Sequence, residues 1–306
     1  VQQIAGDEGA QATGEMVRRG PGYALLNIIP SIPTMPPVAE SVDPVEEPWT
    51  YTIVAKVIVV LCHLAVMLGI VGIGYWHFGS VRTGTGVATL YLMLPYTAQM
   101  TGHIDHALPA ALLVWAVLCY RRPLTAGLFL GLATSLVYYP LFLLPLWISF
   151  YWRRGLARFV IGVSAAMVVM AIALVFIPDT SYLANLQQMF GLWLPMQKGL
   201  EGIWALGWNP VYRMPVLAAF VALSGTLAIW PPQKNLGTLL SCSAAVMVAT
   251  QFWHGFGGGL YMGWYLPLAL LTIFRPNLED RVALAVLGEG WVPRRNTALN
   301  GGFKAA

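Results

Sequence analysis

Charged residues are scarce in this chain. They make up 10% of its 306 residues, whereas soluble globular domains carry about 25%. Hydrophobic residues account for 58% of the chain, and the mean hydropathy is +0.66. The apolar runs also lack the alternation with a period of two that membrane β-barrel strands show. The scarcity of charge therefore excludes a soluble domain and predicts an all-α, polytopic transmembrane protein.

Cysteines and common catalytic motifs are equally sparse. The chain has no Gly-x-Ser-x-Gly, His-Glu-x-x-His or Walker sequence, so nothing indicates a hydrolase or an ATPase of those types. The net charge of +4 fits loop arginines that face a membrane surface, and we expect no nucleic-acid partner. No Cys-x-x-Cys pair occurs, and we expect small core residues at the three cysteines, Cys62, Cys119 and Cys242.

Composition divides the chain into three parts. Residues 1–50 are polar and proline-rich and are predicted to form an extracytoplasmic N-terminal loop segment. Residues 51–275 form the multispan transmembrane domain, with an extracytoplasmic loop at 178–212, and residues 276–306 form a cytoplasmic polar tail. Since the chain begins with Val1 and without a signal-like start, we expect a fragment that lacks at least one N-terminal span.

The apolar runs predict about eight spans, several of them short or broken. Many runs have only about 12 to 14 residues, whereas a straight crossing needs about 20. Nine or ten helical elements are expected if some short runs are re-entrant. Residues 124–152 could instead form one long helix, but that helix would put two arginine pairs on opposite faces. A hairpin that turns near Pro140 is the preferred interpretation.

The positions of the basic residues predict the topology. Basic residues recur at intervals of two apolar runs, so they share one side if every run crosses, and that side is cytoplasmic by the positive-inside rule. They are Arg82, Arg121, Arg122, Arg153, Arg154, Arg158, Lys234, Arg275 and Arg281. The opposite, extracytoplasmic side then collects the segments around His106, Tyr139 and His254 with the loop 178–212. We expect an integral protein of a bacterial inner membrane whose active face is extracytoplasmic.

The segment from His103 to His106 is the most unusual in the chain. It holds Asp105, the only acidic residue between Glu47 and Asp179, and it is flanked by apolar runs. A carboxylate near membrane depth is costly unless it is paired, hydrated or functional. Asp105 can serve acid–base chemistry or bind a divalent cation, the single cofactor that the sequence suggests. It can equally be the N-cap of a helix that begins at the next residues.

Other polar residues on the predicted extracytoplasmic side have two interpretations each. Arg213, at the end of the long loop, suits a phosphate group or a simple anchor for the next span. The loop aromatics suit sugar or lipid-headgroup contact, or an interfacial segment lying on the membrane. His254 precedes a glycine-rich stretch and is a second-rank candidate. His63 lies within a span, where a helix-packing hydrogen bond is expected.

Several motifs together resemble the GT-C class of membrane glycosyltransferases, which use polyprenyl-phosphate sugars as donors. The resemblance covers roughly residues 85–275 and is closest to mannosyltransferase-like members. It implies transfer of a mannose-like hexose to an extracytoplasmic acceptor. The matching stretches are Leu94-Pro95-Tyr96, His103-Ile104-Asp105-His106, Arg121-Arg122-Pro123, Tyr139-Pro140-Leu141, Arg153-Arg154-Gly155 and Trp264-Tyr265-Leu266-Pro267.

The resemblance also implies roles for individual residues. In that class a catalytic acid lies in the first extracytoplasmic loop, and Asp7 and Glu8 are similar to the acidic start of that loop. Asp105 is the third catalytic candidate. The residues expected to bind substrate are His103, His106, Tyr138, Tyr139, Arg213 and His254. Two rival classes stay open: a transporter that uses Asp105 and His106 as a proton or cation relay, and a non-catalytic membrane scaffold.

Overall fold

The structure, a computed structural model, confirms the all-α class for the residues that it describes. These are residues 49–99, 104–152, 155–173, 202–232, 234–253 and 261–276, and within them every regular element is a helix. Three helices are long and apolar enough to cross a membrane: Lys56–Phe78, Leu156–Ala173 and Leu236–Trp253. The other apolar helices of this part are shorter.

The first two helices form an antiparallel pair. Helix α3 (Trp49–Ile73) continues into a π-helical turn, η2 (Gly74–Phe78), and ends at Gly79, whose φ of 72° favours glycine. The Ser80 side chain then accepts the Thr83 N–H and starts α4 (Val81–Met93). A bond of 2.9 Å between His63 Nδ1 and Tyr91 Oη joins the two helices, which confirms the packing role expected for His63.

Prolines divide the next stretch into short helices. The run expected at 87–99 is broken at Leu94, where α4 ends and α5 (Pro95–Gln99) begins. Helix α6 (Ile104–Leu118) starts earlier than expected, so Asp105 lies inside its first turn and is not the N-cap residue. Helix α7 (Pro123–Leu136) is followed by η3 (Tyr139–Leu143) and α8 (Leu144–Tyr151), which confirms the hairpin with Pro140 in its turn.

Helix α9 (Leu156–Ala173) lies directly against α7 because small residues line their contact. A Cβ atom added at Gly127 would overlap the Phe159 carbonyl oxygen, and one at Gly131 would lie 2.7 Å from the Val163 oxygen. Small residues of this kind let membrane helices approach backbone to backbone. The other face of α9 is exposed and apolar, with Ile161 among its exposed residues.

The last elements return through the centre of the molecule. Two short 3-10 turns, η6 (Gly202–Ala205) and η7 (Pro210–Tyr212), lead into α11 (Arg213–Ile229). Helix α12 (Leu236–Trp253) follows, then η9 (Met262–Trp264) and α13 (Leu266–Ile273).

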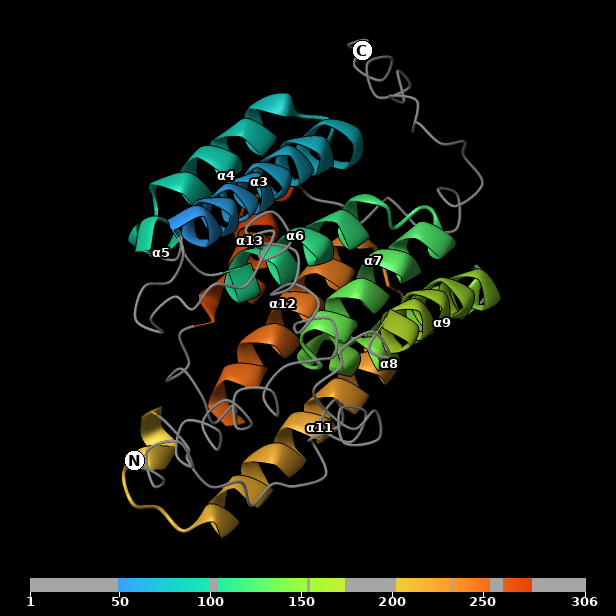
Figure 1. Cartoon of the computed structure of the whole chain (residues 1–306). Helices are drawn as coiled ribbons and strands as arrows, with labels where there is room; N and C mark the ends of the chain where they lie inside the picture. Colours follow the sequence, from blue (N-terminus) through green and yellow to red (C-terminus); the bar gives the residue numbers. More distant parts are fainter. Residues whose placement is uncertain are drawn as a thin grey trace, which may run out of the picture.

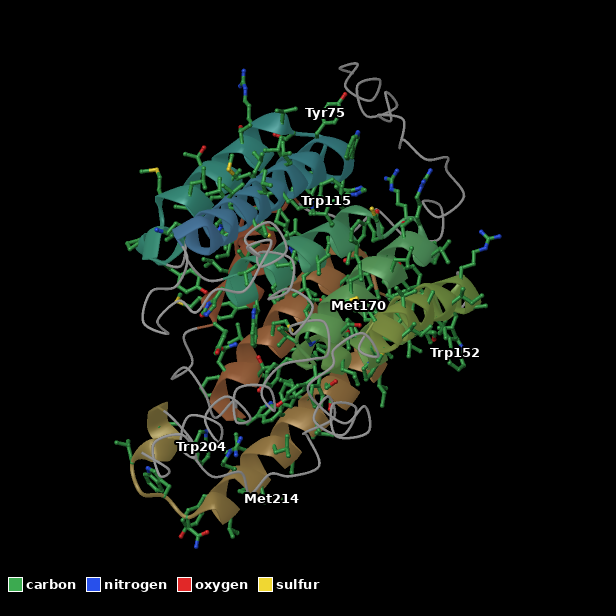
Figure 2. All side chains as sticks on the ribbon, in the orientation of Figure 1. Tyr75, Trp115, Trp152, Met170, Trp204 and Met214 are labelled. Atoms are coloured by element: carbon green, nitrogen blue, oxygen red, sulfur yellow. The ribbon has the colours of Figure 1, made fainter. Side chains whose placement is uncertain are left out.

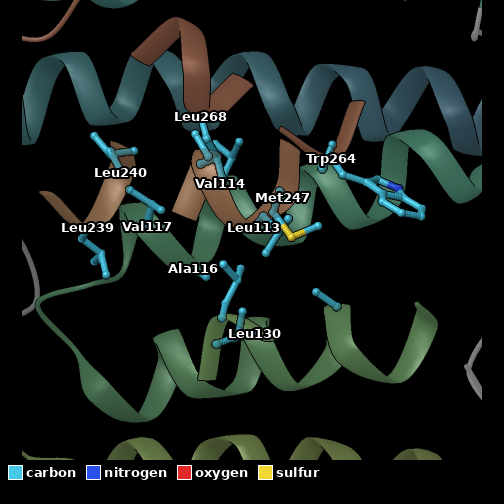
Figure 3. Packing of buried hydrophobic residues seen from close by; sticks show 14 of the residues in the cluster. Leu113, Val114, Ala116, Val117, Leu130, Leu239, Leu240, Met247, Trp264 and Leu268 are labelled. Atoms are coloured by element: carbon cyan, nitrogen blue, oxygen red, sulfur yellow. The ribbon is translucent and has the colours of Figure 1, made fainter. Parts of the chain in front are cut away.

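The helices lie in layers. Figure 1 shows α3 and α4 on one side, α6, α12 and α13 in the middle, and α7, α8 and α9 on the other side. Helix α11 packs against α8 and α12. The centre is filled by buried side chains of α6, α7, α12 and α13, including Val114, Leu130, Leu240 and Leu268 (Figure 3).

Successive helices alternate in direction, so their termini gather at two ends of the bundle. The two ends carry different residues. At one end Tyr151 Oη donates to the Tyr120 carbonyl at 2.5 Å and His77 Nε2 donates to the Leu118 carbonyl at 2.8 Å. Blue nitrogen tips extend at the upper right of Figure 2, away from the labelled Trp204. We name this the basic end, because it carries Arg82, Arg121, Arg122, Arg158, Lys234 and Arg275.

Candidate functional site

A buried arginine lies at the other end of the bundle. Arg213 is the first residue of α11, and only 5% of its surface is exposed. Its Nη2 donates to the carbonyl of Trp253, the last residue of α12, at 2.9 Å. The guanidinium carbon lies 5.8 Å from the centre of the Trp204 ring. Arg213 thus caps the C-terminus of α12, where carbonyls lack helical partners and a cation is favourable.

Two neighbouring tyrosines lie at the break between α7 and α8. Tyr138 Oη donates to Tyr139 Oη at 2.9 Å, and both side chains are buried. Burial raises the pKa of the Tyr138 hydroxyl to about 12, although the hydrogen bond with Tyr139 and the charge of Arg213 both act to lower it. The Tyr138 hydroxyl is therefore a neutral donor at physiological pH.

Trp253 joins the tyrosines to the arginine. Its ring centre lies 5.3 Å from that of Tyr139 and 6.4 Å from that of Tyr138. The indole Nε1 is buried and has no hydrogen-bond acceptor among the described residues. A buried indole N–H can donate to an acceptor oxygen.

An aromatic stack continues from the tyrosines to His106. The centre of the Trp264 ring lies 5.3 Å from that of Tyr139 and 4.4 Å from that of Tyr261. The Tyr261 ring also stacks on His106, with ring centres 4.5 Å apart. His106 Nδ1 lies 2.7 Å from Tyr96 Oη, which also accepts the Gly263 N–H at 2.9 Å. We name this the aromatic end; its members are Tyr96, His106, Tyr138, Tyr139, Trp204, Arg213, Trp253, Tyr261 and Trp264.

The aromatic end is rich in hydrogen-bond donors. Arg213 and Trp253 only donate, while Tyr138 and Tyr139 offer hydroxyls. Asp105 is the only carboxylate in the described ranges, and it lies in the first turn of α6, beside His106. A buried set of this kind suits a ligand that is anionic and rich in acceptor oxygens, while ring faces suit the C–H faces of a sugar.

The structure brings four of the predicted site residues together: His106, Tyr138, Tyr139 and Arg213. For Asp105 the backbone is described and the side chain is not. The remaining candidates, Asp7, Glu8, His103 and His254, lie outside the described residues. In the described part of the chain no group of three or more His, Cys, Asp or Glu could hold a metal ion. The divalent cation suggested at Asp105 stays a prediction.

Four residues of the aromatic end were not singled out as site residues from the sequence: Tyr96, Trp253, Tyr261 and Trp264. Each lies within a few residues of a proline or a glycine at the end of an apolar run. These residues could have been predicted from one signal: an aromatic residue next to a helix break on the predicted extracytoplasmic side.

Comparisons of the chain with protein-family models, with curated proteins and with solved structures find no match.

Proposed function

We propose that the chain is a polytopic membrane protein and that its short helices cross the bilayer beside the long ones. Three helices have the length and composition of spans. The short helices are apolar and alternate in direction with them, and proline breaks shorten them. Under the positive-inside rule the basic end faces the cytoplasm and the aromatic end faces the extracytoplasmic side.

Within this proposal the chain is a glycosyltransferase of the GT-C type. It transfers a mannose-like hexose from a polyprenyl-phosphate donor to an extracytoplasmic acceptor. The observation that carries the proposal is the buried donor set at the aromatic end: the Arg213 guanidinium with the indole N–H of Trp253 and the hydroxyl of Tyr139, which accepts the Tyr138 proton. A phosphodiester-linked sugar supplies the acceptor oxygens that such a set requires.

The residues have separate roles in this proposal. Arg213 binds the donor phosphate beside the ring of Trp204, which is only partly buried and suits contact with the sugar. Asp105, one residue before His106, acts as a base toward the acceptor hydroxyl or binds a divalent cation. Asp7 and Glu8 remain catalytic candidates on the resemblance alone.

Transfer of labelled hexose from a polyprenyl-phosphate donor tests the proposal in purified protein reconstituted in lipid nanodiscs. The wild type is expected to transfer sugar. Asp105→Asn, Asp7→Asn and Arg213→Gln are then expected to lose most activity, whereas Arg121→Gln at the basic end keeps it. Full activity in the variants of both Asp7 and Asp105 would reject the catalytic roles. Proton-driven uptake into proteoliposomes without any sugar transfer would favour the transporter class instead.

A further inference from the structure

Helices α7 and α9 run side by side in the same direction. Gly127 on α7 faces Phe159 on α9. One turn further along α7, Gly131 faces Val163, one turn further along α9. Both helices therefore begin at the basic end, and the positive ends of their dipoles lie there together.

Two arginines lie at these helix starts. Arg122 is the N-cap residue of α7, and Arg158 lies in the first turn of α9. A Cβ atom at Gly155, just before α9, would lie 2.9 Å from Pro123 Cγ, so the two starts are in contact. Arg158 is exposed, and no hydrogen bond or ion pair joins it to another described residue. Guanidinium groups and helix dipoles both favour an anion at this place.

An exposed apolar stripe continues from Arg158 along α9. Residues that follow at intervals of three or four share one face of a helix. On this face the exposed residues after Arg158 are Ile161, Ala165, Val169 and Ile172. Val169 follows Arg158 by 11 residues, or roughly 16 Å of helix, which is close to half of the ~30 Å hydrocarbon core. The stripe therefore has the length of one bilayer leaflet.

The neighbouring face of α7 widens this apolar surface. Gly162 on α9, four residues after Arg158, packs against the backbone of α7, and a Cβ atom there would overlap the Leu124 carbonyl oxygen. The side chains of Leu124 and Leu128 are 43% and 36% exposed. Exposed leucines of α7 thus adjoin the stripe of α9 across Gly162.

We propose that the starts of α7 and α9 bind a phospholipid with an anionic headgroup. Arg122 and Arg158 contact its phosphate, and the exposed apolar residues of the two helices contact its acyl chains. The arginines and the stripe match the two parts of one amphiphile, whereas a free phosphate would use the arginines alone. The inference rests on the proposal that the chain spans a membrane and does not depend on sugar transfer. Under the positive-inside rule this lipid lies in the cytoplasmic leaflet, opposite the proposed sugar donor.

Photo-crosslinking of the full chain in nanodiscs tests the inference. The bilayer is phosphatidylcholine with a trace of phosphatidylglycerol that carries a diazirine on an acyl chain. Phosphatidylcholine with the same diazirine is the lipid control. Phosphatidylglycerol is expected to label peptides from 122–128 and 158–172 in several-fold excess over the control. Equal labelling by the two lipids would overturn the inference.

Two arginine variants make a matched pair. Arg158→Gln is expected to lower the excess labelling about fivefold, the effect of one basic residue near an anionic headgroup. Arg82 is also exposed at the basic end, but polar residues, Thr85 and Thr89, follow it on its face of α4. Arg82→Gln is therefore expected to leave the labelling unchanged. Equal losses in both variants would indicate general attraction to the basic end and would reject a site between α7 and α9.

Two further measurements separate the remaining outcomes. Excess inorganic phosphate at constant ionic strength is expected to leave the labelling unchanged, and loss of labelling would reject a lipid as the occupant. Alkaline carbonate extraction of membranes that contain the chain tests the membrane proposal itself. Release of the chain would reject that proposal, whereas retention with equal labelling by both lipids would overturn the inference alone.

Discussion

The two ends of the helical bundle carry opposite chemistry. At the basic end Arg82, Arg158 and Arg275 are exposed. Lys234 there is 6% exposed and donates to the backbone carbonyls of Ala228 and Pro231. At the aromatic end a single arginine, Arg213, is 5% exposed and surrounded by rings and hydroxyls. Exposed charges remain hydrated and cost little, whereas a buried charge needs compensating groups. The comparison teaches that the number of charges at an end does not by itself indicate a binding site: in our proposal the sugar donor binds at the end with fewer charges.

The largest expected effect concerns which side each end faces. Leu206 at the aromatic end and Trp152 at the basic end are exposed to similar extents, 74% and 66%, and they make a matched pair. In intact bacterial cells, a membrane-impermeant thiol reagent is expected to label Leu206→Cys fully and Trp152→Cys not at all. The unsubstituted chain gives the background from its three cysteines. Equal labelling of both variants would break the assignment of two sides.

The next effect compares a buried with an exposed arginine. Arg213→Gln is expected to weaken donor binding roughly 10- to 100-fold, because a hydrogen bond to a charged group contributes ~1.5–3 kcal/mol. Arg213→Lys keeps the charge and loses the planar fork, so an intermediate loss is expected. Arg121→Gln serves as the control at the basic end. Binding isotherms in nanodiscs measure the difference, and equal losses for Arg121 and Arg213 would remove the distinction between the two ends.

A substitution in the contact between α7 and α9 tests whether their close packing stabilises the fold that holds the two ends in place. A Cβ atom at Gly127 would overlap the Phe159 carbonyl oxygen, so Gly127→Ala is expected to destabilise the fold by about 1–3 kcal/mol. At Gly225 on α11 an added Cβ atom meets nothing within 4 Å, and Gly225→Ala is expected to leave stability unchanged or slightly raised. Thermal unfolding in detergent separates the two, and a harmless Gly127→Ala would contradict the packing.

The smallest effect is the pH dependence from Tyr138. Burial raises the pKa of its hydroxyl in the folded state from 10.0 to about 12, so the folded state holds this proton more tightly than the unfolded state. The contribution of this proton to the free energy of unfolding is fully present below pH 10, and it is lost as the pH rises from there through about 12. Tyr138→Phe is expected to flatten the stability curve in that window. A curve for Tyr138→Phe that falls as steeply as the wild-type curve would argue against burial of Tyr138.

Much of the fold follows from local signals. Apolar runs without a period of two predict the helical class. The arginine pairs predict the hairpin between α7 and α8, and Pro140 predicts its turn, because proline removes a helical donor. The apolar pattern does not predict the break at Leu94, because Pro95 lies inside one apolar run. It also predicts too late a start for α6, because the polar residues from His103 to His106 resemble a loop.

The site was predictable only in part. The alternation of apolar runs predicts that Tyr139, Arg213 and His106 belong to one side, and the structure places them at one end of the bundle. Which rings touch depends on helix rotation and on tertiary packing, which local periodicity does not define. The bond from Gly263 to Tyr96 spans 167 residues and has no local signature.

Photo-crosslinking of a polyprenyl-phosphate hexose that carries a diazirine tests the central claim most directly. Both ends contain arginines that could bind a phosphate, and the crosslinked peptides show which end binds it. The account predicts that crosslinked peptides contain residues 202–213, 250–253 or 261–264, and that Arg213→Gln reduces them strongly. Crosslinks concentrated around Arg121, Arg158 or Arg275, and insensitive to Arg213→Gln, would contradict the claim that the aromatic end binds the ligand.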